Sequence, residues 1–186
     1  MEMFEVVDEE DRVIGLAPRS RCHGDPSLIH RVAHVLVFNR RGELLLQKRS
    51  ANKDIQPGRW DTSVGGHLSP GESYLEAAYR EMAEELGIRG ISLTFLYFSK
   101  MRNAIESENV ATYLGEYDGI VVFPPEEIQE VRFWGEQEIE AALGTNLFTP
   151  NFEQEWGLFS ERKGQNLLLF ASSGVSDDND RRGGCV

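Results

Sequence analysis

Apolar and β-branched residues alternate with polar ones in the first third of the chain, a pattern typical of short β-strands. Two such runs flank an acidic turn at residues 8–11, so residues 1–20 are expected to form a hairpin. A second hairpin is expected around a turn that contains Gly42. The predicted strands are Phe4–Val7, Arg12–Leu16, Val32–Phe38, Glu43–Lys48 and Trp60–Val64.

One segment changes from this strand pattern to helical periodicity, and it predicts a helix over Ser73–Leu86. Ser73 and Glu76 have the spacing of a capping box, and Gly87 follows as a stop signal. A single apolar stripe is expected along the helix at i, i+3, i+4, i+7 and i+11. Its members are Leu75, Ala78, Tyr79, Met82 and Leu86.

The second half of the chain predicts more strands and then helices. The strands are expected at Ile91–Lys100, Val110–Tyr117, Ile120–Phe123 and Glu130–Trp134, and the helices at Glu136–Leu143 and Asn151–Arg162. Strands, one central helix, more strands and terminal helices favour an α+β fold, or a mixed β-sheet between helices on both faces. The order is not a regular βαβ alternation.

The length of the chain, 186 residues, fits one buried core better than two. We therefore expect a single domain over residues 1–170. Serine, glycine, aspartate and arginine dominate the end of the chain, with few apolar residues, which predicts a disordered tail over residues 171–186.

The charge balance is strongly acidic, with 31 acidic residues against 19 basic ones and a formal net charge of −12. Such a field repels a phosphate backbone, so nucleic acid is not expected as a partner. An acidic protein that holds a small anionic substrate usually does so through metal ions placed between carboxylates and phosphates.

Neither the cysteines nor the ends of the chain indicate secretion or a membrane. Cys22 and Cys185 are far apart, and they form neither a disulfide framework nor a zinc knuckle. The acidic N-terminus lacks the apolar run of a signal peptide, and no stretch approaches the roughly 20 apolar residues of a membrane span. A cytoplasmic location follows by default.

The predicted helix carries a dense cluster of carboxylates beside its apolar stripe. Glu81 and Glu85 are one turn apart and Glu84 lies next to them, so they repel each other. Charge runs usually face water, and glutamates alone would indicate a solvated helix face. Divalent cations with oxygen ligands would instead reverse the repulsion. Arg80 can hold Glu72, whose charge suits the N-terminus of the helix.

The spacing of these residues favours the metal interpretation. The positions that matter are Gly66, Glu72, Arg80, Glu81, Met82, Glu84, Glu85, Gly87 and Ile88. This pattern resembles the Nudix box in full. The resemblance implies a mixed β-sheet sandwiched between helices, dependence on Mg²⁺ or Mn²⁺, and hydrolysis of a nucleoside diphosphate linked to another group. It places metal ligands at Glu81, Glu84 and Glu85, with a carbonyl oxygen of Gly65 or Gly66 completing the shell. The general base stays open.

A wider part of the chain, roughly Cys22 to Phe152, resembles the isopentenyl-diphosphate isomerase-like branch of the same superfamily. The resemblance rests on Ile29–Asn39, Gly42–Leu45, Trp60–His67 and Phe148–Pro150. It implies a second metal site with five ligands, His23, His30, His67, Glu106 and Glu108. The alternative is that His23 and His30 are ordinary loop and surface histidines.

Gly65 stands where that branch of isomerases has the cysteine that transfers a proton. Because glycine carries no proton to give, and the hydrolytic box is intact, a diphosphate hydrolase is the favoured hypothesis. The alternatives are an isomerase of the isopentenyl-diphosphate type, which needs a substitute acid near Gly65, and a non-catalytic nucleotide-binding Nudix module.

The residues that select the substrate are not readable from the sequence. Five cations near the predicted site are candidates for phosphate contacts, Lys48, Arg49, Lys53, Arg59 and Lys100. Trp60 and Tyr97 can stack on a base, but aromatic residues in strands are more often core. A small-molecule diphosphate is the expected partner, and the sequence does not predict an oligomeric state.

Overall fold

The structure is a computed structural model that describes residues 2–53 and 55–172. Its strands are β1 (Met3–Val7), β2 (Val13–Pro18), β3 (Ile29–Phe38), β4 (Leu44–Arg49), β5 (Trp60–Asp61), β6 (Val64–His67), β7 (Thr94–Arg102), β8 (Ser107–Glu116) and β9 (Ile128–Trp134). Its helices are α1 (Arg19–Cys22), α2 (Tyr74–Leu86), α3 (Glu136–Ala142) and α4 (Pro150–Ser172).

Strand β3 is the centre of one mixed sheet. It pairs in parallel with β8 along its whole length, from Ile29 opposite Ser107 to Phe38 opposite Glu116. On its other side it pairs antiparallel with β6, and at its beginning with β1. Strand β7 extends the sheet beyond β8, while β4 pairs with β5 and β9. The sheet is therefore mixed, as predicted.

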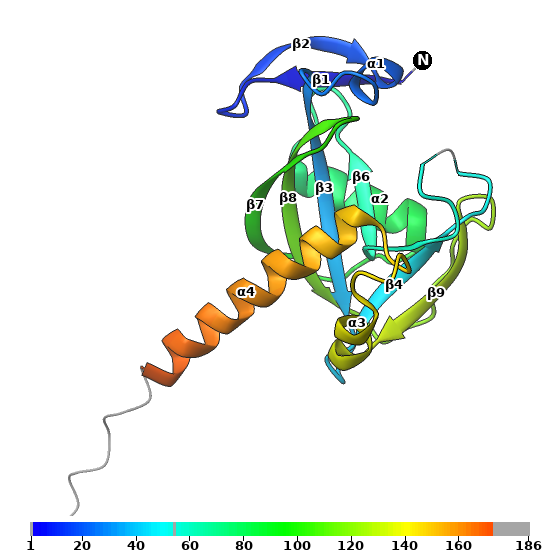
Figure 1. Ribbon diagram of the computed structural model, residues 1–186, viewed down its shortest axis with the longest axis vertical. Helices are drawn as coiled ribbons and strands as arrows, with labels where there is room; N and C mark the ends of the chain where they lie inside the picture. The colour runs from blue at the N-terminus through cyan, green and yellow to red at the C-terminus, as the bar shows by residue number, and fades with distance from the viewer. Residues whose placement is uncertain (1, 54, 173–186) are drawn as a thin grey trace, which may run out of the picture.

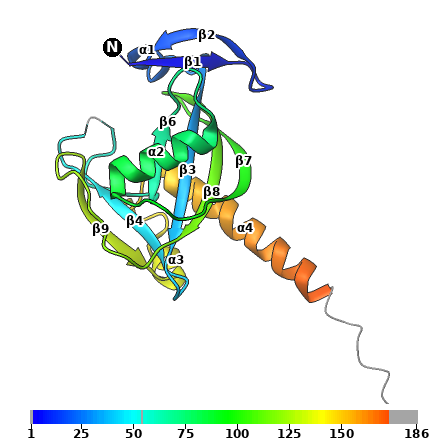
Figure 2. The same ribbon diagram turned by 180° about the vertical axis from the view of Figure 1, so that it is seen from behind.

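Helices cover both faces of this sheet. In Figure 1 the long helix α4 crosses the front of β3 and β8, and in Figure 2, seen from behind, α2 lies across the opposite face. The apolar residues of β3 divide accordingly: Val35 packs under Met82 of α2, and Leu36 packs with Phe152 of α4. The α/β/α sandwich is confirmed.

Helix α2 forms as its local sequence dictates. The side chain of Ser73 accepts from the backbone N–H of Glu76, the Glu76 carboxylate accepts in return, and Gly87 ends the helix with φ +65°. The predicted apolar stripe is only partly correct. Ala78, Met82 and Leu86 are buried, but Leu75 and Tyr79 are exposed, and the buried face instead includes Ala77 and the partly buried Glu85.

The predicted hairpin around Gly42 is present but short. The Asn39 backbone N–H donates to the Glu43 carbonyl, and β3 and β4 pair antiparallel only at Phe38 and Leu44. Farther along, β6 and β1 occupy the same edge of β3, while β8 occupies the other edge. One predicted strand is wrong. Residues 120–123 form no strand; the Val122 backbone N–H instead donates to the Leu86 carbonyl at the end of α2.

The last helix is longer than expected. Helix α4 runs to Ser172 and so includes the first two residues of the predicted disordered tail. The rest of that predicted tail, 173–186, lies outside the described residues. Within the part of the chain that the structure describes, no helix has the length and apolarity to cross a membrane.

Candidate active site

Arg80 contacts carboxylates in the second half of α2 and in the loop before the helix. Its guanidinium donates two hydrogen bonds of 2.8 Å to the Glu72 carboxylate and one of 2.9 Å to the His67 carbonyl. The same side chain contacts Glu81 Oε1 at 2.7 Å and Glu84 Oε2 at 3.3 Å. Such paired, charge-assisted contacts fix the loop rigidly against the helix. The predicted Arg80–Glu72 pair is therefore present.

Gly66 leaves the space that the Glu81 side chain of α2 occupies. A Cβ atom built on Gly66 would lie 2.0 Å from Cδ of Glu81, far inside van der Waals contact. The close approach leaves the Glu81 carboxylate beside the backbone of β6. A carbonyl oxygen of this strand and a carboxylate oxygen of the helix are the donor types that a hard divalent cation takes.

Glu85 is buried at the same place with few groups to balance its charge. Its carboxylate accepts a 3.0 Å hydrogen bond from Gln47 Nε2 and another from the Gly65 backbone N–H. Burial, followed by the charge of Glu81, raises the pKa of Glu85 to about 8. Burial also raises the pKa of Glu81. These carboxylates thus resist carrying their charges together without a cation.

The three box glutamates, Glu81, Glu84 and Glu85, are near each other, but their carboxylate oxygens do not converge on a single point. Among the described residues, no group of three with ligand atoms all within 4.8 Å of one another includes Glu81, Glu84 or Glu85. Arg80 lies between Glu81 and Glu84 and takes an oxygen from each. Glu84 remains largely exposed, so its side chain can turn toward a cation at little cost.

The five residues of the predicted second metal site do converge. His23, His30 and His67 form one compact group, and His30, Glu106 and Glu108 form another, each with all ligand atoms within 4.8 Å. Nε2 of His23 is 3.0 Å from Nε2 of His67, and Nε2 of His30 is 3.6 Å from Glu108 Oε1. His30 is fully buried, yet neither of its ring nitrogens has a hydrogen-bond partner among the described residues.

Unpartnered buried nitrogens facing carboxylates fit a transition-metal cation, for which imidazole and carboxylate are suitable ligands. Burial lowers the pKa of His67 to about 3 against the opposing effect of Glu108, so the imidazole stays in the neutral form that binds metals. The surface-histidine alternative therefore fails for His30, and His23 is also mostly buried.

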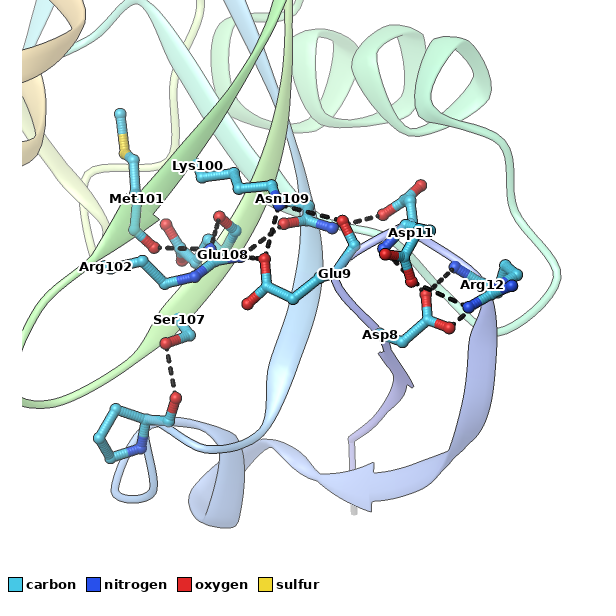
Figure 3. Close-up of polar contacts among 12 residues, drawn as sticks. Asp8, Glu9, Asp11, Arg12, Lys100, Met101, Arg102, Ser107, Glu108 and Asn109 are labelled. Atoms are coloured by element: carbon cyan, nitrogen blue, oxygen red, sulfur yellow. Dashed lines mark hydrogen bonds and ion pairs between the residues drawn. The ribbon is translucent and has the colours of Figure 1, made fainter.

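The N-terminal hairpin closes this end of the sheet. Phe4 in β1 stacks on the His67 ring at 4.3 Å, with the two planes 10° apart. Figure 3 shows the tip of the hairpin fastened to β7 and β8: Lys100 bonds Glu9 at 2.6 Å, and Asn109 donates to Asp11 at 2.8 Å. The acidic turn thus anchors the hairpin beside Glu108.

Both groups of ligands, apart from the fully buried His30, line one cleft of about 790 Å³. Of the five cations predicted near the site, Arg49 and Lys53 line this cleft, together with Arg19. Arg49 pairs with Asp61 at 3.2 Å, and Lys53 pairs with Glu127 at 3.1 Å.

The other three predicted cations, Lys48, Arg59 and Lys100, are not among the residues that line the cleft. The aromatic candidates Trp60 and Tyr97 do not line it either, and both are buried. Cys22 is buried in the apolar cluster that contains Phe4, and it is a free cysteine. It is also far from Gly65 in the sequence.

Sequence reasoning missed a polar network on the opposite face of the sheet from α2. His34 lines the cleft, and its Nδ1 is 2.6 Å from Oε2 of the fully buried Glu155. Burial alone would lower the pKa of His34, but the hydrogen bond and charge of Glu155 outweigh it and raise the pKa. The partners are 121 residues apart, so no local spacing could have indicated the pair.

The family model of the NUDIX domain matches residues 28–152, well over half of the chain. The chain belongs to the Nudix family. The match spans the sheet from β3 to the start of α4, including the whole box and most of the residues that line the cleft.

Nudix proteins of both expected kinds are among the relatives. An uncharacterised Nudix hydrolase of Pseudomonas aeruginosa is 37% identical over 135 residues, 71% of this chain and 78% of the relative. An isopentenyl-diphosphate Delta-isomerase of Nocardia farcinica is 34% identical over 154 residues, 78% of this chain and 87% of the relative. These relatives confirm the predicted class, a Nudix pyrophosphohydrolase, and the likeness to the isomerase-like branch.

The crystal structure of DR0079 from Deinococcus radiodurans has the same fold. It superposes with a TM-score of 0.69 at 26% sequence identity, covering 80% of this chain and 92% of that one. The predicted Nudix fold is confirmed by this likeness.

Proposed function

We propose that this Nudix protein is a Mg²⁺-dependent hydrolase that cuts the diphosphate linkage between a nucleoside diphosphate, or a related organic diphosphate, and another group. The observation that carries the proposal is the close approach of Gly66 and Glu81. It brings a strand backbone and the intact set of box glutamates to one place in the cleft, where the charges of Glu81 and Glu85 need a cation.

The residues of the box and the cleft have different roles in the proposed hydrolysis. Glu81, Glu84 and Glu85, with the Gly66 carbonyl, hold the cation, and Mn²⁺ is a chemically equivalent occupant. A bound cation of this kind neutralises the diphosphate and lowers the pKa of a water molecule. Arg80 and Glu72 keep the loop and helix in register. Arg49 and Lys53, which line the same cleft, attract the substrate's phosphates. Which glutamate takes the water's proton is left open.

The cluster of His23, His30, His67, Glu106 and Glu108 is proposed as a second metal site. Mn²⁺ and Zn²⁺ suit its mixed nitrogen and oxygen ligands. Two features support this second site: Phe4 stacks on the His67 ring, and four of its five residues line the same cleft as the box.

The proposal is tested with a panel of nucleotide, sugar and isoprenoid diphosphates and Mg²⁺ or Mn²⁺. We expect release of a phosphate-containing product from at least one class, and loss of the release when EDTA is added. If the purified protein cleaves no compound on the panel with either metal, the hydrolase assignment is wrong.

A second candidate is the isomerase reaction, favoured by the relatives named isopentenyl-diphosphate Delta-isomerase. The position that needs an acid is Gly65, and a glycine there carries no proton. We therefore expect no dimethylallyl diphosphate when the metal-loaded protein is incubated with isopentenyl diphosphate. Formation of that product would replace the hydrolase proposal with the isomerase.

A further inference from the structure

The floor of the cleft beside Gly65 holds a histidine that the proposed hydrolysis does not use. His34 in β3 is paired directly opposite Gly65 in β6, so their side-chain positions share one face of the sheet. A Cβ atom on Gly65 would lie 3.3 Å from His34 Cδ2 and 3.4 Å from His34 Nε2. The Nε2 edge of the ring therefore fills the space above Gly65.

Buried contacts fix the orientation of this ring. Nδ1 is 2.6 Å from Glu155 Oε2, and Glu155 Oε1 accepts from the Tyr97 hydroxyl at 2.6 Å and the Thr112 hydroxyl at 2.9 Å. A carboxylate only accepts hydrogen bonds, so Nδ1 carries the hydrogen and donates it to Glu155. Nε2 is left for another partner, and it makes no hydrogen bond to the residues that the structure describes.

A second polar group at the same place also lacks a partner. Thr62 lines the cleft, and its Cγ2 lies 3.4 Å from the same Cβ position on Gly65. Its hydroxyl is buried and makes no hydrogen bond within the described part of the chain. A hydrocarbon group placed over Gly65 would seal Nε2 of His34 away from water and would give neither this nitrogen nor the Thr62 hydroxyl a partner. Burying polar groups without partners is unfavourable.

The rest of the cleft is mostly polar, although Val32, Ile55, Ala104, Ile105 and Pro150 also line it. Thr149, Asn151 and Gln154 line it at the start of α4, and no Phe, Tyr or Trp is among the described residues that line it. An isoprenoid tail would find little apolar surface here, whereas a hydroxyl group can both donate and accept hydrogen bonds.

We propose that His34 is a specificity-determining residue whose Nε2, oriented by Glu155, hydrogen-bonds a hydroxyl group of the substrate. The group linked to the diphosphate is then a hydroxylated one, such as a polyol or a sugar, and not a hydrocarbon. This inference rests on the proposed diphosphate hydrolysis and names its substrate class. Glu155 is a positioning residue, because it acts only through the ring of His34.

Two matched substrates isolate the hydroxyl contact. A nucleoside diphosphate esterified with glycerol and the same nucleoside diphosphate esterified with propanol differ only in hydroxyl groups. We expect the wild-type protein to prefer the glycerol compound by roughly 10- to 100-fold in kcat/KM, the range for one hydrogen-bonded group.

His34→Asn is the informative variant. The Asn side-chain nitrogen stands about where Nδ1 was and can still donate to Glu155, so the buried carboxylate keeps its partner. The atom at Nε2 is removed. The preference for the glycerol compound should fall toward unity through a higher KM, with the propanol compound unaffected. Glu155→Gln should give a partial loss of preference, while the matched control Tyr97→Phe, which leaves the His34–Glu155 contact intact, should keep it.

The outcomes separate the two proposals. If the wild-type protein cleaves neither compound nor any other diphosphate on the panel, the proposed function fails and this inference with it. If diphosphates are cleaved but the preference is absent, or is unchanged in a folded His34→Asn variant, the hydrolase proposal stands and His34 has no role in specificity. Loss of the preference in His34→Asn, together with its retention in Tyr97→Phe, supports the inference.

Discussion

Two adjacent glycines, Gly65 and Gly66, meet opposite faces of the sheet and have different tasks. Gly66 leaves room for Glu81 of α2, and its role follows from the sequence because the box spacing requires it. Gly65 faces His34, the one polar side chain in the apolar run Val32–Phe38, but the sequence does not show what this histidine contacts. Its partner Glu155 comes from a distant helix, so only the fold reveals the pair.

Gly66→Ala tests the close approach of strand and helix. The new methyl group would lie 2.0 Å from Cδ of Glu81, so the carboxylate must move away from the cation. We expect metal-dependent hydrolysis to fall on the order of 100-fold, because a catalytic metal supplies several kcal/mol of transition-state stabilisation. Gly157→Ala is the control, since nothing lies within 4 Å of the added atom. Equal activity in the two variants would contradict the geometry.

The His34–Glu155 pair predicts a pH-dependent stability. Glu155 raises the pKa of His34 above its ordinary value of 6.5, so the folded state favours the imidazolium form. This stabilisation is complete below about pH 6.5 and is lost as the pH rises through the higher folded-state pKa. Urea denaturation in the presence of EDTA measures the free energy of unfolding of the wild type and of Glu155→Gln. The excess stability of the wild type should decrease over that pH range. A constant difference would show that His34 stays neutral.

At the scale of elements, the sequence predicts features that depend on local residues better than features that depend on pairing with distant segments. The prediction of helix α2 is correct because its cap, its stop residue and its periodicity all lie within the segment itself. The predicted β3–β4 hairpin forms only next to its turn, because β6, a later strand, occupies the edge of β3 along which β4 would otherwise extend. Residues 120–123 alternate like a strand, but they serve to cover the end of α2.

Ser73→Ala tests the contribution of the cap to the catalytic helix. Ser73 accepts from the Glu76 backbone, so its loss should lower the free energy of unfolding by about 1 kcal/mol. Urea denaturation measures the difference, and Leu75→Ala is the control on the exposed face, expected to change stability by less. The cap would be dispensable if both variants unfolded like the wild type.

At the scale of the whole molecule, segments far apart in the sequence meet around the cleft. The N-terminal hairpin closes over the histidine cluster, α4 supplies Glu155, and the sheet carries the ligands between them (Figure 1). The family model begins at residue 28, so β1, β2 and α1 lie outside the matched region. Sequence reasoning placed all five residues of the histidine cluster through the likeness to the isomerase-like branch, not through their spacing.

The proposed second metal site predicts a stability linked to Mn²⁺. A metal that binds only the folded state at about 100 times its Kd adds about 2.7 kcal/mol to the free energy of unfolding. The matched variant is Glu106→Gln, which keeps the shape of the side chain but removes a ligand charge. It should lose most of the Mn²⁺-dependent rise in Tm, measured by calorimetry, and Glu126→Gln should retain it. An identical rise in both variants would place the metal elsewhere.

The central claim is that the glutamates of the box hold the metal that cleaves a diphosphate. Its most direct measurement is the hydrolysis rate as a function of Mg²⁺ concentration for wild type, Glu84→Gln and Glu76→Gln. Both variants make the same chemical change on α2, and a glutamine in place of Glu76 can still cap the helix. We expect Glu76→Gln to match the wild type and Glu84→Gln to lose on the order of 100-fold in kcat with an unchanged Tm. Full activity in a folded Glu84→Gln variant would contradict the claim.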